Sequence, residues 1–524
     1  MRFAKHVVGL LAILLAAQVA GGADSDPAGQ EPPCSPDPVW KRLGLVESPT
    51  PESGKGVGVV MIDDAGLHSA LLHLGDRLKH VTVDEDMNVA LVEPLRDFKP
   101  PGKEDVDDSH GVPSLLQMGA APFRVHDRSY IGLAPGATYF VVPYDGRDER
   151  RLDRAIEWVV ENRKRWNIRV ILTAGWHIPP PADSRLDGLI KSSKEYPVVR
   201  ALGRAVEAGI LVVAGNGNTS AWNLGPPAEY LAVGAYHDCG CADPKFHREN
   251  LDEPWGRNAD GHLRPDVLAP KYYVPNHITS EGEIGFFGGT SSGSAQVAGL
   301  CALLFAHFPE ADAQTIKYAL IRSGDPLPGS KRPGVRVNAA RAIQALRDRT
   351  VTPPWPRIPP VVTVTDPNRS LESKDAVERA LAVSALARDP ERFRPQGGDE
   401  LRQVFWRSLT DESPTVRKAA ASALRGPESK EERARFWEAL RRESDMGVRG
   451  QMAELLLSDA GADPLDNWIS LAKDPNWTAR WCLVAMLKKH HLDAPRLDYA
   501  FVPEDVEKKA EPILDWYRKK KGAR

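Results

Sequence analysis

The sequence has no marked excess of either charge, because 68 Lys and Arg residues are balanced by 71 Asp and Glu residues, for a net charge of −3. Affinity for nucleic acids comes largely from clustered positive charge. We therefore expect no nucleic-acid partner. Hydrophobic residues make up 42% of the chain, which is enough for packed cores and excludes disorder over most of its length.

Long hydrophobic runs are also scarce, and the one stretch that could interact with a membrane is residues 7–20. It follows Arg2 and Lys5 and precedes small residues and an acidic run, which is the pattern of a signal peptide. The run is short for a spanning helix. We predict a signal peptide at residues 1–23, and hence an exported protein that is secreted, periplasmic or on the cell surface. The alternative is an uncleaved N-terminal anchor; after cleavage, no membrane contact is expected.

Cysteine is rare, with five residues: Cys34, Cys239, Cys241, Cys301 and Cys482. An odd count in an exported protein leaves at least one cysteine outside a disulfide. Cys301 and Cys482 lie in apolar helical stretches and are expected to be buried small hydrophobes. We predict that Cys34 bridges to Cys239 or Cys241. The spacing of these cysteines matches no strong zinc pattern, so no metal site is predicted there.

Residues 38–349 alternate short apolar runs with amphipathic segments, after a Pro/Asp/Gly-rich segment at 24–37 that is expected to be flexible. Near-continuous apolar strands between helices are typical of a parallel sheet covered on both faces. This predicts a doubly wound α/β domain with its site at the carboxyl ends of the strands. The predicted strands are 57–62, 138–142, 170–173, 210–214 and 230–235, and the predicted helices are 152–166, 198–208 and 294–307.

The composition changes twice toward the C-terminus. Residues 350–370 are proline-rich and are predicted to be a semi-rigid linker. From 371 to 524 the chain is rich in Ala, Leu, Arg and Glu, and an Asp…Arg pattern followed by an apolar helix recurs about every 30–40 residues. This all-α region resembles HEAT repeats, in which stacked helical hairpins bury a continuous core. The alternative is an ordinary helical bundle.

Four separate segments of the α/β region contain residues that suggest chemistry. The first is a buried strand that ends in Asp63 and Asp64. The others contain His110 followed by Gly111, Asn216 flanked by glycines, and Ser291 in a Gly-Thr-Ser-Ser-Gly-Ser loop that opens a helix.

Each segment alone is a weak signal, but together they supply the parts of acyl transfer. A serine is a poor nucleophile until a base removes its proton, and a histidine can act as that base near neutral pH. A carboxylate must hold the imidazole in the right tautomer, and hydrogen-bond donors must face the oxyanion. Ser291 lies at a helix N-terminus, where backbone N–H groups favour developing negative charge.

These segments resemble the catalytic domain of the subtilisin-like serine proteases, the subtilase family, over about residues 38–345. The resemblance implies that Asp63 orients His110 and that His110 is the general base and acid. It also implies that Ser291 is the nucleophile and Asn216 the oxyanion donor. By the same resemblance, Ala174, Gly175 and Gly215 contact substrate, and the substrates are proteins or peptides.

The sequence also departs from the family pattern. Ala295 stands where the family usually has Pro, Gln296 where it often has His, and the turn after Asp63 has an extra residue, so Asp64 competes for the orienting role. The predicted function is a secreted serine endopeptidase. The alternative is a weak or inactive pseudoprotease that serves as a protein-binding scaffold. No cofactor is predicted. Calcium is frequent in the family, but no calcium site is identified, and the repeats are expected to bind a protein partner.

Overall fold

The computed structural model describes most of the chain. The described residues are 37–63, 73–92, 110–125, 128–144, 148–173, 193, 197–218, 225–250, 253, 255–258, 260–271, 274–278, 284–358, 362–389, 401–457, 463–495 and 506–522. The predicted signal peptide, Cys34, Asp64, Ala174 and Gly175 lie outside them.

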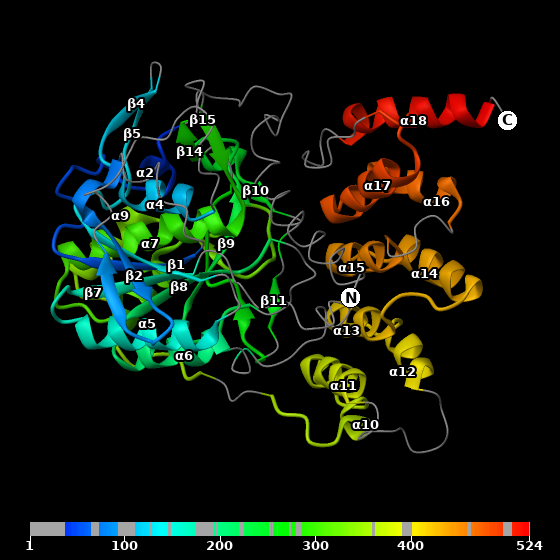
Figure 1. Ribbon diagram of the computed structural model, residues 1–524, viewed down its shortest axis with the longest axis horizontal. Helices are drawn as coiled ribbons and strands as arrows, with labels where there is room; N and C mark the ends of the chain where they lie inside the picture. Colours follow the sequence, from blue (N-terminus) through cyan, green and yellow to red (C-terminus); the bar gives the residue numbers. More distant parts are fainter. Residues whose placement is uncertain are drawn as a thin grey trace.

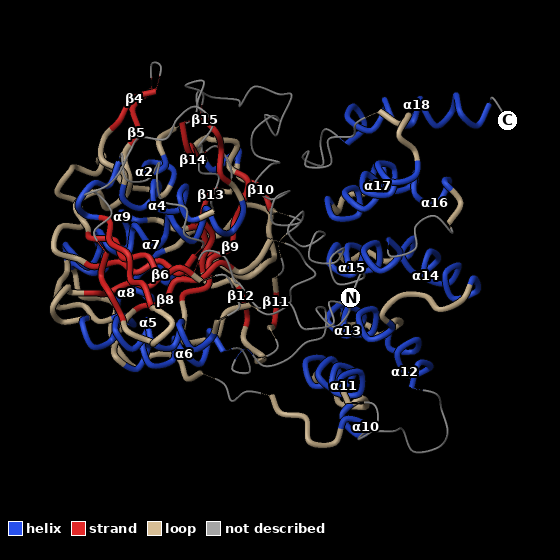
Figure 2. Tube along the Cα trace, viewed as in Figure 1, coloured by secondary structure: helices blue, strands red, loops and turns tan. Residues whose placement is uncertain are grey.

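A mostly parallel sheet forms the centre of the first region (Figures 1 and 2). Its strand order is β16-β13-β9-β8-β7-β1-β6-β2-β3. Within it, β3 pairs antiparallel with β2, and β10 pairs antiparallel with β9. The strands of this sheet are β1 (Gly58–Asp63), β2 (Leu78–Val83), β3 (Val89–Val92), β6 (Thr138–Pro143), β7 (Ile168–Thr173), β8 (Leu211–Gly215), β9 (Leu231–His237), β10 (Arg248–Glu249), β13 (Val267–Pro270) and β16 (Val335–Arg336). Three hairpins lie outside it: β4 (Phe123–Val125) with β5 (Arg128–Tyr130), β11 (Gly256–Arg257) with β12 (Leu263–Arg264), and β14 (Val274–Ile278) with β15 (Ile284–Phe287).

Side chains alternate between two hydrophobic cores along the central strands. In β1, Val59 and Met61 join the core beneath one face of the sheet, whereas Val60 and Ile62 join the core on the other face. Successive side chains of a strand point to opposite faces. The sequence reads as an unbroken apolar run because helices cover both faces.

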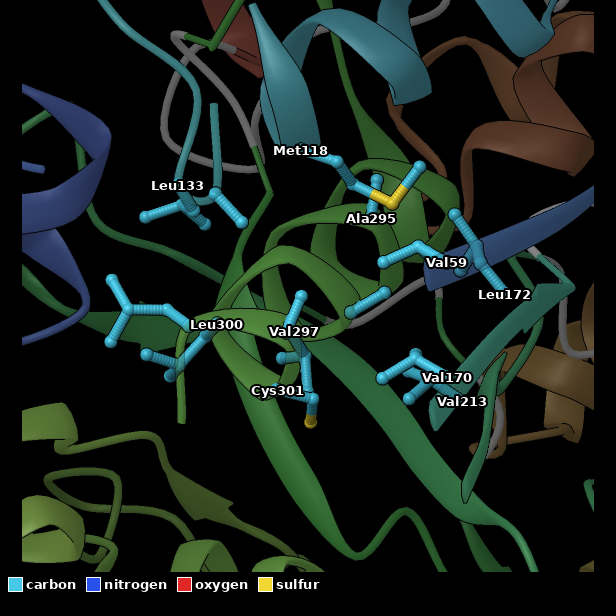
Figure 3. Packing of buried hydrophobic residues seen from close by; sticks show 14 of the residues in the cluster. Val59, Met118, Leu133, Val170, Leu172, Val213, Ala295, Val297, Leu300 and Cys301 are labelled. Carbon is cyan, nitrogen blue, oxygen red and sulfur yellow. The ribbon is translucent and has the colours of Figure 1, made fainter. Parts of the chain in front are cut away.

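Helices cover the two faces in separate layers. The first core is completed by α4 (Gly111–Gly119), α7 (Gly289–His307), α8 (Ala313–Ser323) and α9 (Ala339–Arg347), and the second by α5 (Glu149–Asn162) and α6 (Pro197–Glu207). Figure 3 shows side chains of α7 packed against strand residues of the first core, including Val59, Val170 and Val213. This arrangement confirms the predicted doubly wound α/β class.

The central helix α7 begins earlier than the sequence indicates. We expected a helix at 294–307, but the structure has helix from Gly289 onward. Every residue from Gly289 to Phe305 is buried, so tertiary packing overrides the poor helix propensity of Gly289 and Gly293. As a result, Ser291 lies within the first turn of α7.

The short helix α2 (Val39–Arg42) is fixed to the loop after β9 by a buried ion pair. Both side chains of the pair are fully buried, and the Arg42 guanidinium donates to the two carboxylate oxygens of Asp238 at 2.6 and 3.0 Å. In the same loop, Cys241 is disulfide-bonded. Cys301 and Cys482 are buried thiols, as expected. The pairing with Cys34 stays a prediction because Cys34 is not described.

The proline-rich segment after α9 is divided between two cores. Val351 and Trp355 pack against the first core of the α/β region, and the Trp355 ring stacks on Tyr318 with centroids 5.2 Å apart. Val362 and Val364 pack instead against the core of the helical region. The boundary between residues that pack on the α/β region and residues that pack on the helical region therefore lies between residues 355 and 362, inside the predicted linker.

The C-terminal region is a row of helices, α10 to α18 (Figure 1). Helices α11, α13, α15 and α17 pack on one another in succession, and α12, α14 and α16 lie beside them. A core that contains Phe436, Trp437 and Trp468 joins the helices. This is consistent with helical repeats. The helices are α10 (Pro367–Ser370), α11 (Ala376–Arg388), α12 (Leu401–Ser408), α13 (Pro414–Leu424), α14 (Lys430–Arg442), α15 (Met446–Leu457), α16 (Leu465–Ile469), α17 (Trp477–His490) and α18 (Val506–Gly522).

The recurring arginines have a common structural role in this row. Each donates to the backbone carbonyl six residues earlier, which closes the loop before its own helix: Arg379 to Ser373, Arg417 to Asp411, Arg449 to Glu443 and Arg480 to Asp474. The first three also pair with a carboxylate of the next repeat: Arg379 with Asp411, Arg417 with Glu443 and Arg449 with Asp474. The Asp…Arg pattern therefore links neighbouring repeats. That these are HEAT repeats stays a prediction.

Within the described ranges, no helix has both the length and the apolar character needed to cross a membrane.

We predict that a fragment ending at residue 358 folds alone, because it keeps Val351 and Trp355 in the first core. Thermal unfolding followed by circular dichroism should show one cooperative transition. A fragment ending at residue 349 is the matched comparison. It loses both side chains, about 2–4 kcal/mol of buried apolar contact, and should melt roughly 5–10 °C lower. Insolubility of the longer fragment would mean that the helical row is part of the α/β core.

Candidate active site

Asp63 is the last residue of β1, at the carboxyl edge of the sheet. The alternation along β1 directs its side chain to the same face as Val59 and Met61, where α4 and α7 pack. The Asp63 side chain is fully buried, and its backbone carbonyl accepts a hydrogen bond from Tyr144 N–H. The position of Asp63 in the strand alternation thus directs this carboxylate toward α4, which follows His110, and toward α7, which carries Ser291. Asp64 lies outside the described residues.

His110 directly precedes α4, and its ring contacts the Asp63 carboxylate. The Nδ1 atom lies 2.9 and 3.0 Å from the two carboxylate oxygens. The His110 side chain is 14% exposed, in contrast to the fully buried partner. An ionised carboxylate only accepts hydrogen bonds, so Nδ1 carries the proton and donates it. Nε2 then has a lone pair that can accept a proton from another group.

Ser291 is the third residue of α7 and is 5% exposed. The first N–H groups of a helix have no partner within it, and the helix dipole favours negative charge there. One turn further on, the Ser294 hydroxyl donates to the Ser291 carbonyl at 3.0 Å, which helps to hold the turn. A tetrahedral oxyanion formed at Ser291 would therefore lie beside the positive end of α7.

Asn216 follows β8 and is 4% exposed. Its backbone N–H donates to Val233 O of β9 at 2.9 Å, which anchors the start of the loop to the sheet. The loop is joined to α7 by contacts of Gly217 and Asn218 with Thr290. Thr290 belongs to the Gly-Thr-Ser-Ser-Gly-Ser loop of the sequence, but the pattern alone gave no reason to pair it with Asn218.

A buried polar network lies behind Ser291. The Ser292 hydroxyl donates to Gln117 Oε1 of α4 at 3.0 Å, and Gln296 Nε2 donates to Ser292 Oγ and to Pro270 O, each at 3.1 Å. Ser292 and Gln296 are fully buried. This network connects the helix that follows His110 with the helix that carries Ser291. Gln296, a departure from the family pattern, is thus built into the packing of the site.

The predicted substrate-contacting residues are only partly described. Gly215 ends β8 and is buried, next to Asn216. Ala174 and Gly175 lie outside the described residues; the strand before them, β7, ends at Thr173, which is 4% exposed. Because β7 is a parallel neighbour of both β8 and β1, Thr173 and Gly215 lie at the same edge of the sheet as Asp63.

Two ionisable groups lie near the carboxyl end of β9, the buried Glu253 and the half-buried His237. Burial raises the pKa of Glu253 to about 8. Its Oε2 accepts a hydrogen bond from Ala235 N–H at 2.7 Å. Burial, together with Lys271 and Arg248, holds the pKa of His237 well below its usual range. Both groups are therefore predominantly neutral at pH 7 and add little charge near the first turns of α7.

No group of three or more His, Cys, Asp or Glu side chains within the described ranges is arranged to hold a metal ion. The candidate site is built from a carboxylate, an imidazole, a hydroxyl and a carboxamide. Such a set can remove a proton from an alcohol, return it to a leaving group and donate hydrogen bonds to an oxyanion. These are the elements of acyl transfer.

Comparison with known proteins identifies the α/β region. Residues 127–343 match the model of the subtilase family. Alkaline elastase YaB of Bacillus sp. (strain YaB) is 25% identical over 211 residues, which are 39% of this chain and 47% of the relative. The match thus spans about half of that protein's length. The matched family segment contains Asn216 and Ser291, whereas Asp63 and His110 precede it.

Solved structures of proteases also resemble the chain. The protease domain of PatA has 20% sequence identity and a TM-score of 0.41, with 57% of this chain and 99% of that chain covered. A cold adapted subtilisin-like serine proteinase has 16% identity and a TM-score of 0.39, covering 57% and 97%. Fervidolysin from Fervidobacterium pennivorans has 17% identity and a TM-score of 0.38, covering 56% and 43%. On the family match, the α/β region of this chain contains a subtilase domain, the domain of subtilisin-like serine proteases.

Proposed function

We propose that this protein is an exported serine endopeptidase that hydrolyses peptide bonds through Asp63, His110 and Ser291, with Asn216 as an oxyanion donor. The observation that carries the proposal is the contact of both Asp63 carboxylate oxygens with His110 Nδ1. Two segments far apart in the chain bring these groups together, and neither the composition nor the strand pattern requires it.

The geometry supports a division of roles. The Asp63 carboxylate fixes the tautomer in which His110 Nδ1 carries a proton, so that Nε2 is the basic nitrogen. His110 Nε2 takes the Ser291 hydroxyl proton as Ser291 Oγ attacks the scissile carbonyl carbon. Breakdown of the tetrahedral intermediate cleaves the C–N bond, and His110 gives the proton to the leaving amine. This leaves an acyl ester on Ser291.

Hydrolysis of the ester repeats the same steps with water. His110 takes a proton from the attacking water, and the second tetrahedral intermediate releases the carboxylic acid while Ser291 regains its proton. In both intermediates the oxyanion would be held by the Asn216 side chain and by the backbone N–H groups at the start of α7. The first turn of α7 supplies further stabilisation through the helix dipole.

Substrates would be proteins or peptides, because the resemblance to the subtilase family assigns Ala174, Gly175 and Gly215 to substrate contact. Export rests on the signal-peptide pattern of residues 1–23. The helical row would serve as a binding surface for a protein partner, since stacked repeats offer extended faces. No calcium site is proposed.

Ser291→Ala should abolish hydrolysis of a peptide substrate and labelling by a fluorophosphonate probe, while the thermal unfolding curve stays unchanged. Removing one member of a cooperative triad costs on the order of 10⁶ in turnover. Ser408→Ala, the same change on α12, is the control and should keep full activity. If the wild-type protein neither hydrolyses peptides nor reacts with the probe, it is a pseudoprotease and a binding scaffold.

Asp63→Asn and Asp64→Asn distinguish the two candidates for the orienting carboxylate. Asp63→Asn should lower turnover by roughly 10⁴, because the neutral amide no longer fixes the histidine tautomer. Asp64→Asn should cost tenfold or less, about 1.4 kcal/mol in activation free energy. Steady-state kinetics on one peptide substrate decide this, and the opposite ranking would assign the role to Asp64.

Asn216→Ala should weaken turnover by ~10²–10³, because one side-chain oxyanion donor is lost while the backbone donors stay. KM should change little, since the donor acts on the transition state. The measurement is the separate determination of kcat and KM. A change confined to KM would show that Asn216 binds the ground state of the substrate.

A further inference from the structure

The side chain of Asn218 bridges the loop of Asn216 and the first turn of α7. Its Oδ1 accepts hydrogen bonds from Thr290 N–H at 2.6 Å and from the Thr290 hydroxyl at 3.0 Å. Thr290 directly precedes Ser291, and Asn218 lies two residues after Asn216. One carboxamide oxygen therefore connects the two segments that would supply the oxyanion donors.

The Asn218 contact supplies a hydrogen-bond acceptor that the N-terminus of α7 lacks in its own sequence. The N-cap position is Gly288, which has no side chain to accept a hydrogen bond from the first N–H groups of the helix. Asn218 supplies that acceptor from a different segment. Gly289 makes room for it, because a Cβ at Gly289 would lie 2.6 Å from Asn218 Oδ1. The backbone at Gly289 also has a φ of +78°, which favours glycine.

Thr290 extends the contact back to the loop. Its hydroxyl oxygen accepts a hydrogen bond from Gly217 N–H at 3.2 Å while its proton goes to Asn218. Thr290 is 1% exposed, whereas Gly217 and Asn218 are half-buried, so Thr290 shields its side of these bonds from bulk water. Asn216 is thus held on one side by its bond to Val233 and on the other by the contacts of Gly217 and Asn218 with Thr290.

We infer that Asn218 is a positioning residue that sets the distance between the Asn216 side chain and the backbone N–H groups at Ser291. The inference rests on the proposed peptidase function. Oxyanion donors must lie 2.7–3.1 Å from the oxyanion, and a misplacement of about 1 Å can cost 10²-fold in rate. In this role Asn218 acts through its contacts with Thr290, which in turn holds Gly217.

The test is Asn218→Leu, which keeps the size of the side chain and removes the acceptor. It should lower kcat about 10–100-fold and leave KM within about threefold. Affinity for a peptide aldehyde, which would add to Ser291 Oγ as a tetrahedral hemiacetal, should fall by the same factor as kcat. A purely structural role would lower the melting temperature without this parallel loss. Asn218→Asp, which keeps acceptor oxygens, should lose less activity than Asn218→Leu.

A double-mutant cycle with Thr290→Val tests whether Asn218 affects kcat through its hydrogen bonds to Thr290. Thr290→Val should lower kcat in the wild-type protein and have a smaller effect in Asn218→Leu, because the two changes share the Thr290–Asn218 hydrogen bond, whereas the Gly217–Thr290 bond is lost only with Thr290. Independent, additive losses would overturn the inference. Asn467→Leu, which removes an exposed amide acceptor on α16, is the matched control and should be neutral.

The outcomes separate this inference from the function on which it rests. An active wild-type protein with a fully active Asn218→Leu variant overturns the role of Asn218 alone. A kcat loss without a matching loss of aldehyde affinity also overturns it. A wild-type protein that neither hydrolyses peptides nor reacts with a fluorophosphonate overturns both. If Asn218→Leu does not fold, Asn218→Ala is measured in its place, with the same expected losses.

Discussion

The α7 helix is buried on all sides from Gly289 to Phe305, and the candidate site is arranged around its first turn. A helix with no solvent-facing side must pack against something over its entire surface. The sheet contributes one such surface and α4 another. The helix that carries Ser291 and the helix that follows His110 are therefore parts of one hydrophobic core. Their relative position is as rigid as that core.

Apolar packing places the helices relative to the sheet, and polar contacts then fix the positions of the candidate site residues. Each contact joins segments distant in sequence: Asp63 to His110, Gln117 to Ser292, and Asn218 to Thr290. All lie at the edge of the core, where burial strengthens hydrogen bonds and makes unsatisfied groups costly. The departures from the family pattern fit this scheme, since Gln296 bonds to Ser292 and to Pro270 O. The amide nitrogen of Gln296 thus has two hydrogen-bond acceptors inside the buried network.

The helical region is held together differently. Helices α11 and α13 carry many alanines and pack closely. Half-buried arginines such as Arg417 close the loop before their own helix and pair with a carboxylate farther along the row. The same interaction recurs along the row, which explains why one sequence pattern recurs with it. In a row of this kind each helix pair contacts mainly its nearest neighbours, and the stack buries one continuous core. It has a hydrophobic cluster separate from both cores of the sheet.

The sequence by itself determined the elements whose cause is local. The apolar strand runs, the amphipathic helices and the Asp…Arg repeats all follow from periodicity, which is why the α/β class and the helical character of the C-terminal region could be predicted. The four segments that contain Asp63, His110, Asn216 and Ser291 were also visible as motifs.

The tertiary structure decided what those residues contact. The partner of Thr290, the earlier start of α7 at Gly289 and the packing of Val351 and Trp355 on the α/β core all depend on segments distant in sequence. Local patterns do not encode such contacts, because they are fixed by how buried helices and strands pack around one another.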